Sequence, residues 1–254
     1  MMIGAQSYTV RAYTQTERDF RIAMERIALI GYTSVQLSGI GSIDPKTVRS
    51  ICDDNGLAIV LTHTNPERIL ADTDAVIREH DVLGCGYIGI GSMPERYRSA
   101  DWIDRFACDF YEPAQRMREA GKLLMYHNHN FEWERLPGGK TMMDTMLDSM
   151  PANIMGITLD TYWVQAAGAD VCAWIEKLAG RIPCVHLKDM AVKGFTQRMA
   201  AVGEGNIDFE RILRQLARQG TTKHILVEQD DCYGDSPFAC LKRSYDYLKG
   251  LGYC

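Results

Sequence analysis

The segment Gly121-Lys122-Leu123-Leu124-Met125-Tyr126-His127-Asn128-His129-Asn130 combines a short apolar run with a polar cluster directly behind it. The arrangement recurs three times further along the chain, and the later polar clusters are Asp160-Thr161-Tyr162-Trp163, His186-Leu187-Lys188-Asp189 and Glu228-Gln229-Asp230. Apolar runs of this length, separated by helical stretches, are typical of buried parallel strands. Ionisable side chains at the ends of such strands are costly to bury unless they converge on a ligand, and a divalent metal is the obvious candidate.

The same alternation of amphipathic helix and apolar strand extends over the whole chain of 254 residues. The pattern predicts strands at 2–7, 34–37, 58–63, 87–90, 123–127, 157–160, 184–188 and 224–228. It predicts helices at 17–29, 45–55, 69–83, 101–120, 141–150, 171–178, 208–219 and 237–249. No linker or low-complexity tract separates these units, so we expect an α/β fold, a (β/α)₈ TIM barrel, as a single domain over residues 1–254.

An open, doubly wound parallel sheet is the alternative fold for such an alternation. Its usual marker is a G-x-G-x-x-G turn after the first strand, and this chain has no such turn. Gly203-Glu204-Gly205 supplies two of the glycines but does not follow directly on a predicted strand. The sequence therefore favours the closed barrel.

Composition argues against several classes of function. The net charge of −5 and the isoelectric point near 5.7 give no basic footprint for nucleic acid. No stretch approaches the roughly 18 apolar residues that span a bilayer, and the N-terminus lacks the pattern of a signal peptide. The charge and the lack of a long apolar stretch lead us to expect no membrane or nucleic-acid partner. The eight cysteines form no CxxC pair, so we expect reduced thiols and a cytoplasmic location.

Strand alternation decides which of the polar side chains point into the mouth of a barrel. His127 and His129 share one face of their strand, as do His186 with Lys188 and Glu228 with Asp230. A single histidine at a strand end is more often structural, but four such ends in consecutive repeats favour a metal site. We therefore expect a divalent metal of the Mn, Zn, Co or Fe type. Its expected ligands are His127, Asp160, His186 and Glu228.

Three further residues are candidates for substrate contacts. His63 ends the third predicted strand and is placed to enter the mouth. Trp163 follows Asp160 in a mouth-side loop, where an aromatic ring either stacks on a sugar or plugs the core. Glu132 either folds back over the site as a second carboxylate or only solvates its loop.

The segments YHNHNFEW, LDTYW, HLKD, VGEGNIDF and VEQDD resemble the xylose-isomerase-like TIM-barrel family of sugar isomerases and epimerases. The resemblance covers essentially the whole chain. It implies a divalent metal held by Glu, Asp, His and Glu from the last four strands, of which the final three correspond to Asp160, His186 and Glu228. His127 departs from the pattern, because ketose epimerases carry a glutamate there, and Trp163 stands where some epimerases have a histidine.

We therefore expect an enzyme that acts on a small sugar or keto-sugar by removing a proton next to its carbonyl. Glu228 or His129 would remove the proton, and Lys188 would stabilise the developing oxyanion of an ene-diolate. Reprotonation then gives epimerisation or isomerisation. The main alternative is a lyase, since β-elimination from the same enolate works with one base, and a third is a non-catalytic metal- or sugar-binding protein. Oligomerisation, the phosphorylation of the substrate and the reaction type stay open.

Overall fold

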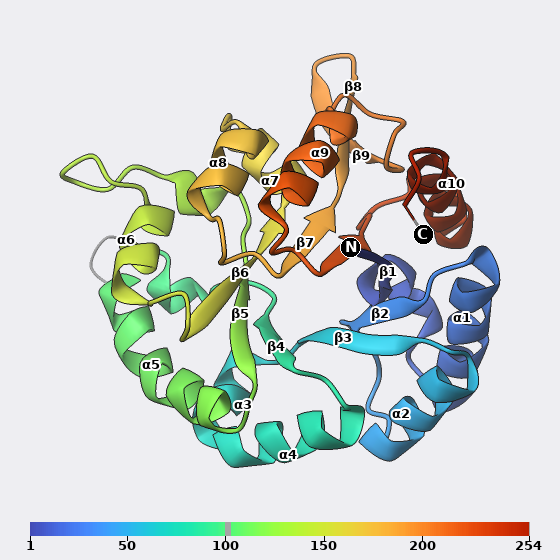
Figure 1. The fold of residues 1–254 in the computed structure, drawn as a ribbon, viewed down its shortest axis with the longest axis horizontal. Helices are drawn as coiled ribbons and strands as arrows, with labels where there is room; N and C mark the ends of the chain where they lie inside the picture. Colours follow the sequence, from blue (N-terminus) through green and yellow to red (C-terminus); the bar gives the residue numbers. More distant parts are fainter. Residues whose placement is uncertain (100–102, 254) are drawn as a thin grey trace.

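In the computed structural model, which describes residues 1–99 and 103–253, eight parallel strands close into a barrel inside a ring of helices (Figure 1). The strands follow one another around the barrel in chain order, and the last one pairs with the first. They are β1 (Met2–Gln6), β2 (Ser34–Leu37), β3 (Ala58–His63), β4 (Tyr87–Ile90), β5 (Leu123–His127), β6 (Met155–Asp160), β7 (Cys184–Leu187) and β10 (His224–Val227). The predicted (β/α)₈ barrel is confirmed.

The outer ring consists mainly of helices that begin at a side-chain cap, as their sequences predict. Asp44, for example, accepts hydrogen bonds from the backbone N–H groups of Lys46 and Thr47 ahead of a proline at the first helical position. The helices are α1 (Glu17–Ile30), α2 (Pro45–Asp54), α3 (Pro66–Ala71), α4 (Thr73–Leu83), α5 (Ile103–Glu119), α6 (Met142–Ser149), α7 (Thr161–Ala166), α8 (Val171–Lys177), α9 (Phe209–Gln219) and α10 (Pro237–Gly250), with 3₁₀ turns η1 (Ser7–Tyr13), η2 (Glu95–Tyr97) and η3 (Phe131–Trp133). None of the described helices is long and apolar enough to cross a membrane.

Three parts of the chain differ from the predicted pattern. Trp163 was expected in a mouth-side loop and lies in the helix α7 (Thr161–Ala166), which begins at the capping side chain of Asp160. The expected helix at 69–83 is divided into α3 and α4 at Asp72, whose backbone is extended and whose side chain caps Ala75. An antiparallel hairpin, β8 (Asp189–Lys193) with β9 (Thr196–Ala200), follows β7 and rises beyond the barrel (Figure 1). The hairpin strands mix polar and apolar residues, so the sequence has no apolar run there that would predict a strand. Residues 101 and 102 of the expected helix at 101–120 lie outside the described residues.

The interior of the barrel divides into an apolar layer and a polar layer. Buried side chains of β3, β5, β7 and β10 form a small apolar cluster inside the barrel, and its members are Val60, Leu61, Met125, Cys184 and Leu226. A much larger apolar cluster fills the space between the sheet and the helices. On β3, β5, β6, β7 and β10 an ionisable residue follows the apolar ones, so these residues gather at the carboxyl ends of the strands. In barrels of this architecture the active site is built at that end.

Candidate metal and sugar site

The structure brings together the four residues that the sequence predicts as metal ligands. His127 ends β5, Asp160 ends β6, His186 lies in β7 and Glu228 directly follows β10. Parallel pairing places Asp160 opposite His186, and the next strand pair continues the same level of the barrel. All four side chains are buried, and one ligand atom from each lies within 4.8 Å of the others. Within the described residues, they form a group that could hold a metal ion.

The two histidines are fixed so that one ring nitrogen of each faces a carboxylate. His127 Nδ1 donates to the carbonyl oxygen of Gly91 at 2.9 Å, and His186 Nε2 donates to Gln36 Oε1 at 2.6 Å. The other ring nitrogen of His127, Nε2, then lies 3.2 Å from Asp160 Oδ2. The other ring nitrogen of His186, Nδ1, lies 2.9 Å from Glu228 Oε2. Histidines that bind metals usually donate their second N–H in this way, which fixes the ring and its tautomer.

The contact between His186 and Glu228 tests whether a cation fits. Burial lowers the pKa of His186, which favours the neutral ring, and Nδ1 has no hydrogen-bond partner. A lone pair on this nitrogen would then face a carboxylate oxygen, and such a contact is costly unless a cation lies between the two atoms. Burial also lowers the pKa of His127, but Asp160 and Glu228 outweigh it and leave that pKa raised. A proton on His127 and a metal ion are therefore alternative ways to balance the same carboxylates.

Each carboxylate uses one oxygen for the protein and leaves the other for the centre of the site. Asp160 Oδ1 accepts the backbone N–H of Trp163 at 3.0 Å, and Glu228 Oε1 accepts Gln6 Nε2 at 2.7 Å. Burial alone would raise the pKa of both carboxyls, but Lys188 and the histidines lower it below the usual range. Two ionised carboxylates and two imidazoles form a mixed nitrogen and oxygen donor set, which suits Mn, Zn, Co or Fe.

Lys188 is buried beside the four candidate ligands and pairs with three carboxylates. Its Nζ lies 2.7 Å from Asp230 Oδ2, 3.3 Å from Glu228 Oε2 and 3.6 Å from Asp160 Oδ2. Burial would lower the pKa of Lys188, but the carboxylates raise it well above the usual value, so this lysine is a fixed cation. A fixed cation at the edge of a metal site can stabilise a negative oxygen of a substrate.

Asp230 belongs to the site, although the sequence did not single it out as a catalytic or binding residue. Burial and the nearby Glu228 raise the pKa of Asp230 to about 6, and its Oδ1 has no partner. The available signal was its spacing of two from Glu228, which put both carboxylates on one face. Asp230 lies beyond the end of β10, where that alternation is less certain to persist.

The structure places His63 and His129 against the metal ligands on the β3 and β5 sides of the mouth. The ring of His63 lies 5.3 Å from that of His127, its Nδ1 is 3.1 Å from Ser38 Oγ, and its Nε2 has no partner. His129 lies between His127 and Trp163, at ring distances of 4.9 and 5.1 Å. Burial lowers the pKa of His129 to about 3, so this ring is neutral.

Trp163 and Glu132 contribute to the wall of the site in different ways. The Trp163 ring covers His129, and Lys188 Nζ lies 5.4 Å from the ring centre. Glu132 is fully buried and accepts hydrogen bonds from the Tyr126 hydroxyl at 2.5 Å and from the backbone N–H of His129 at 2.9 Å. These contacts occupy both of its oxygens, so Glu132 holds the His127–His129 segment in place.

A pocket of about 470 Å³ opens above this group of residues. Its lining includes Tyr8, Asn65, His129, Glu228 and Asp230, together with His63, Thr64, His127 and Lys188. The volume lies within the range of ordinary small-molecule sites, roughly 300–1,000 Å³. A pocket of this size, with several polar side chains in its lining, suits a monosaccharide-sized ligand.

Comparisons with known proteins agree with this architecture. A family model described as xylose isomerase-like TIM barrel matches residues 24–250. An inosose dehydratase of Lacticaseibacillus casei is 22% identical over 270 residues, which cover 91% of this chain and 89% of that protein. A sugar phosphate isomerase/epimerase from Parabacteroides distasonis has a structure with a TM-score of 0.83 and 24% identity over 98% of this chain and 97% of its own. The structure of an L-ribulose 3-epimerase gives a TM-score of 0.77 and 16% identity, covering 99% and 94% of the two chains.

The hydrogen bond between Gln36 and His186 yields a test of the metal site. We expect Gln36→Leu to weaken the binding of Mn²⁺ by about 10- to 100-fold, because His186 loses the partner that fixes its tautomer. Titration calorimetry with MnCl₂ measures the change. Gln215→Leu is the matched control, since Gln215 Nε2 donates to the backbone of Cys172 on the outer ring. Equal affinity in Gln36→Leu and the control would contradict the assigned role of His186.

Proposed function

Because the chain belongs to the xylose isomerase-like TIM barrel family, we propose that it is a divalent-metal-dependent sugar isomerase or epimerase. The observation that carries the proposal is the convergence of two carboxylate oxygens and two imidazole nitrogens beside a pocket whose lining includes His127 and Glu228. His127, Asp160, His186 and Glu228 would hold the metal. When bound, a divalent metal polarises a carbonyl and a neighbouring hydroxyl, which acidifies the proton on the carbon next to the carbonyl.

The proton transfers are assigned to side chains on different sides of the barrel. Glu228 follows β10 and His129 follows β5, and both strands contribute to the same pocket. The Glu228 carboxylate removes the proton next to the carbonyl, and His129, with its unpartnered Nδ1, is the second candidate for this step. Return of a proton to the other face of the same carbon gives epimerisation, and return to the neighbouring carbon gives isomerisation.

Lys188, Asp230 and His63 bind and orient the substrate in this scheme. Lys188 stabilises the negative oxygen of the ene-diolate, because its ammonium is buried and fixed by carboxylates. Asp230 Oδ1 and His63 Nε2 both lack partners and belong to residues that line the pocket. They are therefore available for hydrogen bonds to substrate hydroxyls. Trp163 packs against His129 and helps to hold that ring in place.

A lyase is the second candidate function. His127 stands where the two-glutamate epimerases have their first glutamate, and β-elimination needs only one base. The match to a protein named inosose dehydratase favours the same chemistry. In this alternative the enolate forms as above and then expels water from the next carbon.

Incubation in D₂O separates these functions. The purified protein is analysed for bound metals and then incubated with a panel of ketoses, aldoses and inososes, and the products are read by NMR. Deuterium at the carbon next to the carbonyl of an isomer supports the isomerase or epimerase, and an unsaturated product supports the lyase. If the protein binds stoichiometric metal but forms neither product, it is a binding protein and not an enzyme. A folded protein without affinity for divalent metal would overturn the proposal.

Substitution of Glu228 tests the assignment of the base. We expect Glu228→Gln to lower kcat by about 10²–10⁴-fold, the range for loss of a general base, since the amide cannot accept the proton. Asp231→Asn is the control, because Asp231 lies in the neighbouring loop and caps Tyr233. A chelator should abolish turnover by the wild type, and MnCl₂ should restore it. Full activity of Glu228→Gln would remove this residue from the chemistry.

A further inference from the structure

We propose that the site takes an uncharged, unphosphorylated polyhydroxy carbonyl compound, one hydroxyl of which donates a hydrogen bond to Thr64 Oγ1. This inference rests on the proposed function and names the class of its substrate. Three independent features carry it: an internal carboxylate that fills the anion cradle after β7, the charge balance of the pocket, and a buried hydrogen-bond chain that ends at Thr64.

The first feature is the glycine-containing loop that follows the β8–β9 hairpin. In TIM barrels, backbone N–H groups of the loops after the last two strands commonly bind the phosphate of a substrate. Here the Asp189 carboxylate occupies such a cradle. It accepts the backbone N–H groups of Met190 at 2.7 Å, Gly203 at 2.9 Å, Gly205 at 2.8 Å and Ile207 at 3.2 Å. A β-carbon at Gly205 would lie 2.3 Å from Asp189 Oδ1, so the loop is closed tightly around this carboxylate.

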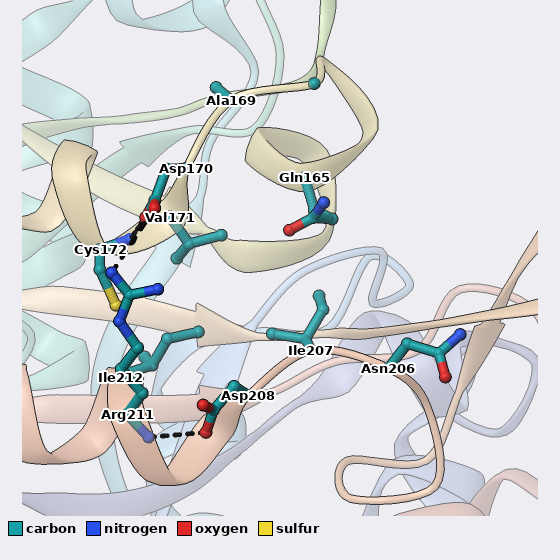
Figure 2. A pocket seen from close by; sticks show the side chains of 11 residues that line it. Gln165, Ala169, Asp170, Val171, Cys172, Asn206, Ile207, Asp208, Arg211 and Ile212 are labelled. Atoms are coloured by element: carbon teal, nitrogen blue, oxygen red, sulfur yellow. Dashed lines mark hydrogen bonds and ion pairs between the residues drawn. The ribbon is translucent and has the colours of Figure 1, made fainter.

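The neighbouring helix ends are also closed to an external anion. A pocket of about 360 Å³ lies where α8 and α9 begin, and Figure 2 shows Asp170, Asp208 and Arg211 on its walls. Asp170 Oδ1 accepts the N–H groups of Cys172 and Ala173, and Asp208 Oδ1 accepts that of Arg211. The Arg211 guanidinium lies 3.5 Å from Asp170. The groups that bind phosphate at helix N-termini are therefore committed to aspartates of the chain itself.

The second feature is the charge of the pocket above the candidate metal site. Lys188 is the one lysine or arginine among the described residues that line it, and its ammonium pairs with Asp230, Glu228 and Asp160. A divalent metal together with Lys188 balances these three carboxylates when the histidines are neutral. A phosphate dianion would enter a site with no uncompensated cation, and it would lose its hydration without a partner. An uncharged ligand avoids this cost.

The third feature is a chain of buried hydrogen bonds that fixes Thr64 Oγ1 as an acceptor toward a ligand. His80 Nδ1 lies 2.7 Å from the carbonyl oxygen of Val76, which can only accept, so this nitrogen carries the proton. Burial lowers the pKa of His80, so its other nitrogen, Nε2, is a bare acceptor. Thr62 Oγ1, at 2.8 Å, donates to that nitrogen and must then accept from Thr64 Oγ1 at 2.9 Å.

Thr64 lines the pocket with its hydroxyl hydrogen already used. The oxygen therefore offers only lone pairs to a ligand, and it selects a donor such as a hydroxyl over an acceptor such as a carboxylate or phosphate. His80 and Thr62 are positioning residues for this preference, because they act through Thr64. The Asn65 amide N–H₂, whose Oδ1 caps α3, and the unpartnered Nε2 of His63 belong to the same lining and can bind the neighbouring hydroxyls.

Matched pairs of free and phosphorylated sugars test the proposal. D-ribulose, D-xylulose, D-fructose and D-tagatose are each compared with their terminal phosphates for deuterium exchange in D₂O by the metal-loaded protein. We expect any pair that reacts to favour the free sugar by at least about tenfold in kcat/KM, the effect of one unfavourable polar contact of about 1.4 kcal/mol. Preference for a phosphorylated member would overturn the proposal.

A binding measurement decides the matter even if none of these sugars reacts. Titration calorimetry with inorganic phosphate should give no binding tighter than about 1 mM for the wild type. In Asp189→Ala the emptied cradle should bind phosphate, and phosphate should raise Tm for this variant selectively over Glu204→Gln, a control in the same loop. Asp189→Ser, whose shorter side chain also opens the cradle, replaces the alanine variant if that variant does not fold. Phosphate binding by the wild type, or its absence from the opened cradle, would contradict the account.

Variants of Thr64 test the recognition of a hydroxyl on the sugar that shows the fastest exchange. Thr64→Val should raise KM by about tenfold and leave kcat within a few-fold, because it removes one hydrogen bond to the substrate. Thr64→Ser should retain the wild-type KM, since serine keeps the hydroxyl. An unchanged KM in Thr64→Val would contradict this contact. Failure of every sugar to react, with the phosphate result as expected, would count against the proposed reaction and not against the exclusion of phosphate.

Discussion

The structure depends most on the close contact between buried imidazole nitrogens and carboxylate oxygens at the floor of the barrel mouth. His186 Nδ1 and Glu228 Oε2 lie 2.9 Å apart, and His127 Nε2 and Asp160 Oδ2 lie 3.2 Å apart. All strands of the barrel end at the same rim, so the side chains that β5, β6, β7 and β10 place there lie close together. This approach is costly unless a proton or a metal ion balances the carboxylates, which is why we propose a metal centre at this position.

The surrounding residues extend the same principle outward. Gln36, Gln6 and the carbonyl of Gly91 each bind the far side of a candidate ligand, so that its other polar atom faces the centre of the site. Beyond them, Asp189 and the helix-capping aspartates satisfy backbone N–H groups that would otherwise attract an anion. The protein thus commits its anion-binding groups to its own carboxylates and leaves its pocket to the metal and to hydroxyl groups.

Most of the barrel could be predicted from the sequence, because short apolar runs and capped helices carry strong local signals. Asp44-Pro45 and the closing glycines are examples of such signals. The four candidate ligands could also be named, since the carboxyl ends of all strands lie at one rim of a parallel barrel. The β8–β9 hairpin and the break at Asp72 were missed, because each depends on side-chain contacts with no apolar period. The place of Asp230 in the site and the burial of Glu132 could not be predicted from the sequence, since the direction of a side chain beyond a strand end follows from packing.

X-ray absorption spectroscopy at the metal edge tests the central claim most directly. The account predicts one Mn²⁺ or Zn²⁺ per chain with two imidazole ligands in the wild type, and one imidazole ligand in His186→Ala. Removal of the Glu228 carboxylate in Glu228→Ala should lower the oxygen coordination without changing the imidazole count. A bound metal without imidazole ligands, or a spectrum that does not change in His186→Ala, would contradict the assignment of the site.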